Sequence, residues 1–306
     1  MLRGMDIPTR RLGRTNERVS SIGLGGFHIG HPDTPDDAAI ALIQGAVDRG
    51  ITFMDNCWDY NSGLSEIRMG RALCVSGYRE RVFLMTKIDG RTKAAFDEQL
   101  EQSLARLLTD RIDLVQFHEV IRHEDAERIF APGGALEAAL AARKAGKVRF
   151  IGFTGHKSPA IHLHMLEVAR RHDFAFDTVQ MPLNVFDAHY DSFAEKVIPA
   201  AQALDMGILA MKTFGDHNLV DAGVVDPIDM LHYSLDLPVS VVITGIDKPA
   251  ILEQAVRAAT SFAPLSPEKR ARILASAAAL AKDGKLERYK TSHFFDGTVQ
   301  NPQWLG

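Results

Sequence analysis

The sequence predicts an α/β protein built as a (β/α)8 barrel of eight parallel strands, each followed by a helix. Short runs of β-branched and apolar residues alternate with longer amphipathic runs, and eight such short runs occur along the chain. The length of 306 residues suits one barrel with about 40 residues left over, whereas a doubly wound sheet usually stops at about five to seven strands. No linker rich in Pro, Gly or Ser divides the chain.

The expected strands are brief and apolar throughout, as buried parallel strands are. They cover residues 21–24, 52–54, 82–86, 114–117, 148–152, 178–180, 207–210 and 240–243. Helix start signals stand before residues 36–49 and 159–171, where Thr34 and Ser158 each place a capping hydroxyl ahead of a proline at the first helical position. Gly50 and Gly146 mark helix ends.

Residues 1–306 are expected to form a single domain with additions at both ends of the barrel. A hairpin-like lead at residues 9–20 would cover the bottom of the barrel. An extra helix at residues 266–281 precedes an aromatic-rich tail at 282–306. Phe294, Phe295 and Trp304 of this tail fit a lid over the barrel mouth, packing on the outer wall, or a subunit contact, so the oligomeric state stays open.

Composition excludes several classes of protein. Apolar residues make up 46% and charged residues 24%, with a net charge of -4, which excludes a disordered chain and lacks the basic excess of a nucleic-acid binder. With only Cys57 and Cys74, no disulfide framework is expected and a reducing compartment fits best. Because no secretory stretch and no run of about 18 apolar residues occurs, we expect a cytoplasmic protein without a membrane partner.

Two apparent motifs do not predict a site. Gly23 and Gly25 begin a Gly-x-Gly pattern, but its sixth position is His28 and no long helix follows, so a Rossmann site is not expected. His118 and His123 are five positions apart, which places them about 140° apart around a helix. They do not make a zinc pair, and no metal is expected.

Four polar residues stand at or just beyond the carboxyl ends of successive strands, where a barrel of this type has its active site. Asp55, Lys87 and His118 close their strands, and Tyr60 follows Asp55 in the loop CWDYNSG. Each alone also fits a structural role, as a turn cap, a strand end, a core histidine or a packing ring. Together they form an acid–base unit, because an ammonium lowers the pKa of a tyrosine hydroxyl, a carboxylate keeps the amine charged, and a histidine orients a carbonyl oxygen.

These residues resemble the aldo-keto reductase family over nearly the whole chain. RRLGRTNERVSSIGLGG is similar to the family's opening, ITFMDNCWDYNSGLSEIRMGRAL to its Asp-to-Tyr signature and RIDLVQFHEV to its histidine strand. The resemblance implies a (β/α)8 barrel that uses NAD(P)H to reduce an aldehyde or ketone to an alcohol, or catalyses the reverse. It makes Tyr60 the proton donor, Lys87 and Asp55 the groups that tune its pKa, and His118 the carbonyl-orienting group.

The resemblance also implies a nicotinamide dinucleotide site, with NADP(H) favoured and NAD(H) allowed. Its residues would be Gly25, Gly26, Asp55, Thr154, Gln180, Met211, Lys212, Phe214, Gly245, Asp247, Lys248 and Gln254. Met211-Lys212 stands where the family has a stacking ring, so Met211 or Phe214 would cover the nicotinamide, or Lys212 would contact phosphates. Lys248 would replace the missing 2′-phosphate arginine, and Asn184 is a cofactor ligand or a turn residue.

Trp58, His118 and His156 are the expected contacts of a small carbonyl or alcohol substrate. Trp58 would line an apolar pocket or pack within its loop, and His156 lies just past a strand end. Two other functions stay open. One is a regulatory barrel that binds the cofactor with negligible turnover, which the altered nicotinamide contacts suggest. The other is a non-redox lyase or isomerase that uses Tyr60 and Lys87 as an acid–base pair.

Overall fold

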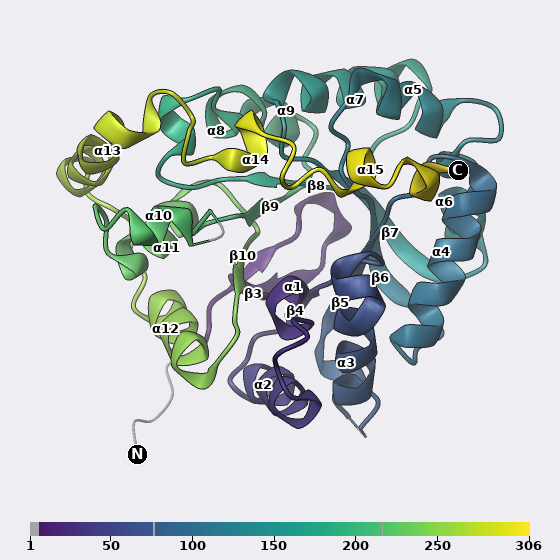
Figure 1. Cartoon of the computed structure of the whole chain (residues 1–306), viewed down its shortest axis with the longest axis horizontal. Helices are drawn as coiled ribbons and strands as arrows, with labels where there is room; N and C mark the ends of the chain where they lie inside the picture. The colour runs from purple at the N-terminus through teal and green to yellow at the C-terminus, as the bar shows by residue number, and fades with distance from the viewer. Residues whose placement is uncertain (1–5, 76, 216) are drawn as a thin grey trace.

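The computed structural model describes residues 6–75, 77–215 and 217–306. Its centre is a closed barrel of parallel strands in the order β10-β3-β4-β5-β6-β7-β8-β9 (Figure 1). The strands are β3 (Ile22–Gly25), β4 (Phe53–Asp55), β5 (Phe83–Ile88), β6 (Ile112–Phe117), β7 (Val148–Thr154), β8 (Thr178–Pro182), β9 (Gly207–Met211) and β10 (Val241–Gly245). Each expected strand is present, with both ends within two residues of the predicted bounds, so the (β/α)8 fold is confirmed.

Helices surround the barrel on its outside (Figure 1). The longer ones are α2 (Asp36–Asp48), α3 (Leu64–Leu73), α4 (Lys93–Arg106), α5 (His123–Phe130), α6 (Ala135–Lys144), α7 (Pro159–Arg171), α11 (Pro227–Asp236), α12 (Pro249–Thr260) and α13 (Pro267–Ala281). The short ones are α1 (Gly26–Ile29), α8 (Phe193–Lys196), α9 (Ile198–Ala203), α10 (Asn218–Asp221), α14 (Arg288–Thr291) and α15 (Gly297–Gln300). Single 3-10 turns, η1 to η5, lie at Gly13–Thr15, Tyr60–Gly63, Arg79–Arg81, Asp187–His189 and Pro302–Leu305.

Both helices with predicted start signals begin where expected, at residues 36 and 159, but only one of the two predicted caps forms. Ser158 caps α7 as expected, since its hydroxyl accepts a hydrogen bond from the Ala160 N–H at 3.2 Å. The predicted capping role of Thr34 is wrong, because α2 has no side-chain cap. Pro35 is extended, with φ −60° and ψ 142°, so it is the cap residue itself and Thr34 lies outside the helix.

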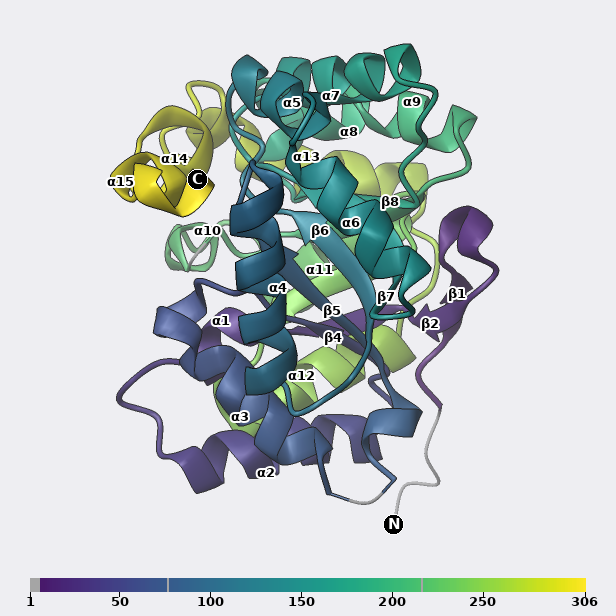
Figure 2. The same ribbon diagram turned by 90° about the vertical axis from the view of Figure 1, so that its right-hand side faces the viewer.

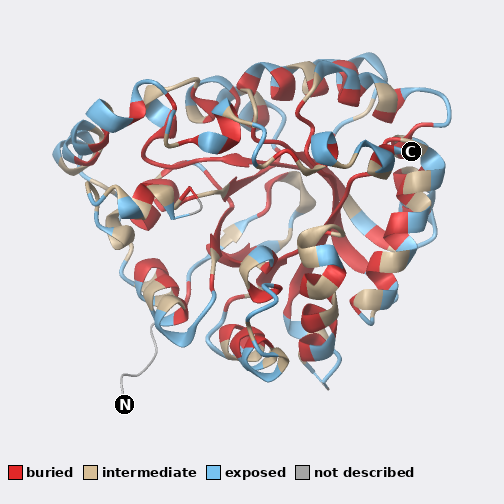
Figure 3. Ribbon diagram, in the orientation of Figure 1, coloured by how far each residue is buried: buried red, intermediate tan, exposed pale blue. Residues whose placement is uncertain are grey.

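Alternation along the strands decides which side chains point into the barrel. In β5, Phe83 and Met85 belong to the interior apolar cluster, whereas Leu84 and Ile88 pack outward against the helices. The period of two places Lys87 on the inner side, at the carboxyl end of the strand. Figure 3 shows buried residues along the strands and exposed ones on the outer faces of the helices. The same alternation sets the orientation of the polar strand ends described below.

The predicted N-terminal hairpin closes the bottom of the barrel. It consists of β1 (Thr9–Arg11) and β2 (Arg18–Ser20), which pair antiparallel. Leu12 and Val19 join the interior apolar cluster. The Arg14 N–H donates to the Asp205 carbonyl at 2.7 Å, just before β9 begins. The expected position of residues 9–20 is therefore confirmed.

The predicted extra helix is present as α13, and the chain beyond it runs along the opposite end of the barrel. Figure 2 shows α14 and α15 at one end of the barrel and the β1–β2 hairpin at the other. The short helices α14 and α15 and the turn Pro302–Leu305 form this tail. Within the described residues, no helix combines the length and the apolar character that crossing a membrane requires.

Candidate active site

A cavity of about 520 Å³ opens at the carboxyl ends of the strands. The sequence-predicted residues that line it are Gly25, Gly26, Asp55, Tyr60, Lys87, His118, Thr154, His156, Gln180, Met211, Lys212, Phe214, Gly245, Asp247, Lys248 and Gln254. They come from most of the strands and meet here because parallel strands in a closed barrel all end at the same rim.

Lys87 is the centre of the four residues predicted to be catalytic. Its side chain is 1% exposed and its ammonium forms an ion pair with Asp55 on the neighbouring strand. The same Nζ donates to the Asn56 carbonyl at 2.8 Å and lies 3.3 Å from the Tyr60 hydroxyl oxygen. A buried ammonium needs such partners, because its desolvation is otherwise costly.

Tyr60 reaches Lys87 because the chain after β4 makes a tight turn. Asn61 and Ser62 both have left-handed backbone angles, with φ 52° and 55°, which carry the chain into α3. Burial, followed by the Asp55 carboxylate, raises the pKa of Tyr60 well above its ordinary value. The expected net lowering of this pKa is not seen, because burial and the Asp55 charge both act in the opposite direction. The hydroxyl therefore holds its proton.

The His118 ring lies edge-on to the Tyr60 ring in the wall of the cavity, with ring centroids 5.9 Å apart. Its Nδ1 lies 2.9 Å from Asp89 Oδ1 and 3.6 Å from Asp59 Oδ1. Burial is the largest influence on the pKa of His118 and lowers it, but the carboxylates of Asp89 and Asp59 outweigh burial, so the pKa is raised. Burial, and then the Asp89 charge, raises the pKa of Asp59 to about 7.

The wall formed by β7, β8 and β9 carries the expected contacts for a carboxamide. Gln180 Nε2 donates to Asp55 Oδ2 at 2.8 Å, which leaves the buried Oε1 without a hydrogen-bond partner among the described residues. Thr154 and Met211 lie together beside it, with 3.9 Å between Oγ1 and the sulfur. The amide of Gln180 is thus oriented by the same carboxylate that holds Lys87.

Lys212 points toward the C-terminal tail. Its backbone is left-handed, with φ 55°, and its ammonium lies 4.4 Å from the centre of the Phe295 ring and 5.5 Å from that of Tyr289. Asn184 is not among the described residues that line the cavity. Its Nδ2 instead donates to the Lys212 carbonyl at 3.1 Å and to the Tyr289 hydroxyl oxygen at 2.7 Å, so Asn184 supports the loop behind Lys212.

The opposite wall is formed by β3, β10 and the start of α12. Gly245 faces the His28 ring so closely that a Cβ atom would lie 2.4 Å from His28 Nδ1, so a side chain there would require the ring to move. Lys248 is the residue that precedes the first turn of α12 and makes no side-chain cap. The amino end of this twelve-residue helix, with Gln254 one turn further on, lines the cavity.

A model of the Aldo/keto reductase family matches residues 21–231, well over half of the chain. The chain belongs to this family. A curated relative, Uncharacterized oxidoreductase YrpG of Bacillus subtilis, is 30% identical over 218 residues, which cover 65% of this chain and 64% of YrpG. Aldo-keto reductase yakc [NADP(+)] of Schizosaccharomyces pombe is 32% identical over 49% of this chain and 46% of its own. The chain thus spans about half to two thirds of these relatives.

Solved structures agree with the fold. An aldo-keto reductase from Bacillus halodurans in its holo form superposes with a TM-score of 0.71 at 21% identity, covering 88% of this chain and 96% of that one. The sequence resemblance to the aldo-keto reductases is therefore confirmed at the level of family and fold.

In this member of the family the tail forms part of the cavity. Phe294, Phe295 and Gln300 line it, so these two rings lie at the barrel mouth, which is one of the three expected placements. His156 lies beneath the tail, where its Nε2 lies 3.0 Å from Asp296 Oδ1. His156 lines the cavity, and its contact with Asp296 holds the tail in place.

Trp58 is not among the described residues that line the cavity. The indole N–H donates to Gln102 Oε1 at 2.7 Å, and the ring packs edge-on against Trp304 with centroids 5.6 Å apart. Of the two roles expected for Trp58, packing is the one that the structure shows. Trp304 accordingly belongs to the outer part of the tail.

Four acidic residues of this site are not predicted from the sequence. Asp59 and Asp89 contact His118, and Glu119 accepts hydrogen bonds from the backbone N–H groups of Gly297 and Thr298 at 3.0 and 2.8 Å. Asp296 bonds His156. The sequence does carry a signal for Asp89, which follows inward-facing Lys87 by two positions, but the contacts of Glu119 and Asp296 join segments far apart in the chain.

Proposed function

We propose that this protein is an NAD(P)H-dependent oxidoreductase that reduces an aldehyde or ketone to an alcohol, or catalyses the reverse. One observation carries the proposal. The Tyr60 hydroxyl lies 3.3 Å from a buried ammonium, Lys87, which is itself paired with Asp55, and all three line a cavity of about 520 Å³. This is the arrangement that a proton donor to a carbonyl oxygen needs.

The residues of the cavity fit a nicotinamide dinucleotide. Gln180 has an unpartnered Oε1 that can accept from a carboxamide N–H, and Thr154 adds a hydroxyl beside it. The amino end of α12 and Lys248 offer positive charge for phosphates. When bound, the dinucleotide supplies the hydride that the carbonyl carbon accepts.

Tyr60, Lys87 and His118 account for the proton and its control. As the carbonyl oxygen gains negative charge, the Tyr60 hydroxyl donates its proton to that oxygen. The tyrosinate that remains is stabilised by the Lys87 ammonium, which Asp55 and the Asn56 carbonyl hold in place. His118 turns Nδ1 to Asp89, which leaves Nε2 for the substrate oxygen and thereby orients the carbonyl.

We propose NADPH as the preferred cofactor. Lys248 is exposed at the cavity rim and is the cation closest in sequence to the start of α12. Its ammonium can serve the 2′-phosphate as a point charge in place of arginine. Asp247 beside it opposes that charge, so the preference over NADH should be modest.

The test follows nicotinamide absorbance in stopped flow against a panel of small aldehydes and ketones. Tyr60→Phe should lower kcat by at least about 100-fold while dinucleotide binding, measured by fluorescence, stays unchanged. Tyr78→Phe is the matched control, because Tyr78 bonds Asp48 on the outer surface. Undiminished turnover in Tyr60→Phe refutes the assignment of the acid, and tight dinucleotide binding without turnover by the native protein favours a regulatory barrel.

A further inference from the structure

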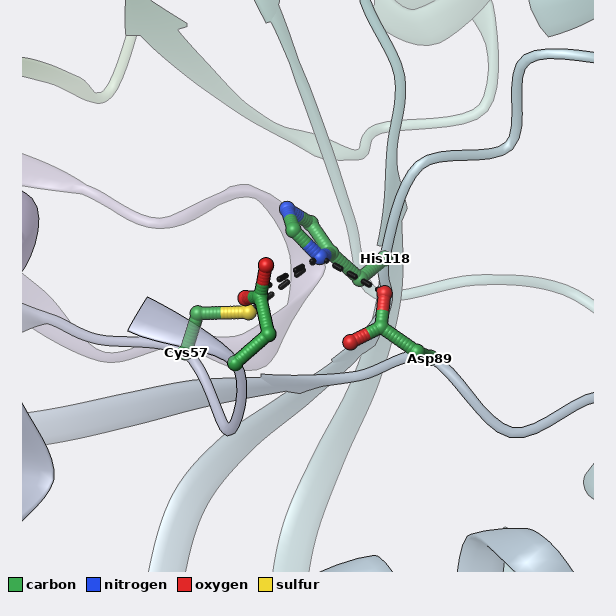
Figure 4. A group of neighbouring side chains, drawn as sticks. Cys57, Asp89 and His118 are labelled. Carbon is green, nitrogen blue, oxygen red and sulfur yellow. Dashed lines mark hydrogen bonds and ion pairs between the residues drawn. The ribbon is translucent and has the colours of Figure 1, made fainter. Parts of the chain in front are cut away.

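A cluster of four potential metal ligands lies beneath the cavity. Cys57 and Asp59 come from the loop after β4, Asp89 follows β5 and His118 follows β6. One ligand atom from each lies within 4.8 Å of all the others. Figure 4 shows Cys57, Asp89 and His118 converging on one point from three successive strand ends.

The spacing of these atoms suits tetrahedral coordination. Bonds of about 2.0 Å to nitrogen and oxygen and 2.3 Å to sulfur place tetrahedral ligands roughly 3.3–3.6 Å apart. Around His118 Nδ1 the observed distances are 3.2 Å to Cys57 Sγ, 3.6 Å to Asp59 Oδ1 and 2.9 Å to Asp89 Oδ1. The three distances from Nδ1 thus lie within a few tenths of an ångström of tetrahedral spacing, and all four ligand atoms lie within 4.8 Å of one another.

Two carboxylate oxygens in the cluster have unused acceptor capacity. Asp59 Oδ1 and Asp89 Oδ2 are buried and accept no hydrogen bond from the described residues. Asp89 is 0% exposed, so water does not solvate it from the surface. An orphaned buried carboxylate oxygen is costly unless a cation or a donor satisfies it.

A buried arginine fixes two of the ligand segments relative to each other. Arg91 is fully buried and donates to the backbone carbonyls of Asp89 and His118, both at 2.6 Å. Asp125 neutralises its charge through an ion pair at 3.1 Å. The separation of the Asp89 and His118 side chains therefore does not depend on the contact between them, as a preformed site requires.

We propose that Cys57, Asp59, Asp89 and His118 form a binding site for a zinc-class divalent transition-metal ion. A set of one sulfur, one imidazole nitrogen and two carboxylate oxygens matches Zn²⁺ and disfavours Mg²⁺ and Ca²⁺, which take oxygen ligands. Binding forms bonds to Sγ, to Nδ1 and to one oxygen of each carboxylate, and releases to water the thiol proton and any proton on Nδ1 or on the Asp59 carboxyl group. Nε2 of His118 points away from the cluster (Figure 4), so the ion would fix this ring without using that nitrogen.

A cysteine nucleophile does not explain the cluster. In a Cys-His-Asp triad the thiol and the carboxylate contact opposite nitrogens of the imidazole. Here Cys57 Sγ and Asp89 Oδ1 both lie at Nδ1 of His118. Cys57 is also 0% exposed, which keeps its sulfur away from substrate.

The test measures metal directly, with neither dinucleotide nor carbonyl compound present. The full chain is dialysed against Zn²⁺, desalted and analysed by elemental mass spectrometry, with one equivalent expected. Titration with Co²⁺ should produce a thiolate-to-cobalt charge-transfer band and the visible bands of a tetrahedral site. Because no turnover is measured, failure of this proposal is distinguishable from failure of the proposed reductase activity.

Matched variants decide which residues hold the ion. Cys57→Ser and Asp89→Asn preserve shape and should each raise the Kd for Zn²⁺ by at least about tenfold. Cys57→Ser should also abolish the charge-transfer band. Cys74→Ser is the control, since Cys74 is exposed and outside the cluster. Circular dichroism of each variant verifies folding. Less than a tenth of an equivalent of Zn²⁺ in the native chain, or a cobalt spectrum that survives Cys57→Ser, overturns the proposal and identifies a hydrogen-bonded cluster only.

Discussion

Asp296 holds the C-terminal tail at the cavity, and Asp296→Asn should release it. The carboxylate contacts His156 Nε2 at 3.0 Å, Lys157 Nζ at 2.8 Å and His293 Nδ1 at 2.7 Å. Its side chain is 1% exposed. The amide of asparagine has no charge, so the variant loses the ion pair with Lys157 and weakens the contacts with both histidines.

The pKa of Asp296 gives the size of the effect. Burial alone would raise this pKa, but the hydrogen bonds from His156, Lys157 and His293 lower it from 3.8 to about 2. That difference corresponds to roughly 2.5 kcal/mol of stabilisation at neutral pH. Because the folded-state pKa is the lower one, the stabilisation is complete above the unfolded pKa and is lost as pH falls through about 2. The variant should therefore differ most from the native chain above pH of about 4.

Tryptophan fluorescence reports this change, since the chain has two tryptophans and Trp58 packs against Trp304 of the tail. When unfolding in urea at pH 7 is followed by this fluorescence, Asp296→Asn should have a free energy of unfolding roughly 2 kcal/mol lower than that of the native chain. This difference between the two chains should narrow toward pH 2.5. Asp283→Asn is the control, because Asp283 contacts only Lys285 in an exposed pair. A gap of equal size at pH 7 and pH 2.5, or no gap at either, would refute the reasoning.

Three further predictions concern other parts of the molecule. Gly13→Ala should lower the free energy of unfolding in urea by more than about 3 kcal/mol, because a Cβ there would lie 2.2 Å from the Gly207 nitrogen. Gly50→Ala is the control and should cost far less, because Gly50 also has a positive φ but faces open space. Phe295→Ala should raise KM for carbonyl substrates several-fold with little change in kcat, and a pure kcat loss would contradict its place in the cavity wall. Lys248→Ala should raise the Kd for NADPH about tenfold and that for NADH little, as fluorescence titration can show; equal losses would remove its assignment to the 2′-phosphate.

The strands and the catalytic group could be predicted because their signals are local. A strand buried on both faces must be apolar along its whole length, so each run is visible in the sequence. The polar residues that close such runs, Asp55, Lys87 and His118, then stand out, and the closed barrel brings them to one rim. Tyr60 follows within one short loop, so its position was constrained too.

The remaining features depend on contacts between distant segments. Glu119 binds residues of the tail nearly 180 positions later, and neither segment has a pattern that indicates the other. The sequence is equally compatible with substrate contact and with packing for Trp58, and the contact with Trp304 that decides between these roles joins distant segments. The pKa of Tyr60 depends on its burial and on the nearby Asp55 charge, and both are set by the three-dimensional structure.

The tail makes this barrel suited to modular engineering. The side chains proposed to carry chemistry stand on strand ends or the adjoining loop, whereas the rings of Phe294 and Phe295 come from one continuous segment. That segment docks through a few polar anchors, chiefly Glu119 and Asp296. Exchanging residues 293–300 while keeping those anchors should alter the accepted carbonyl compounds and leave the proton donor intact.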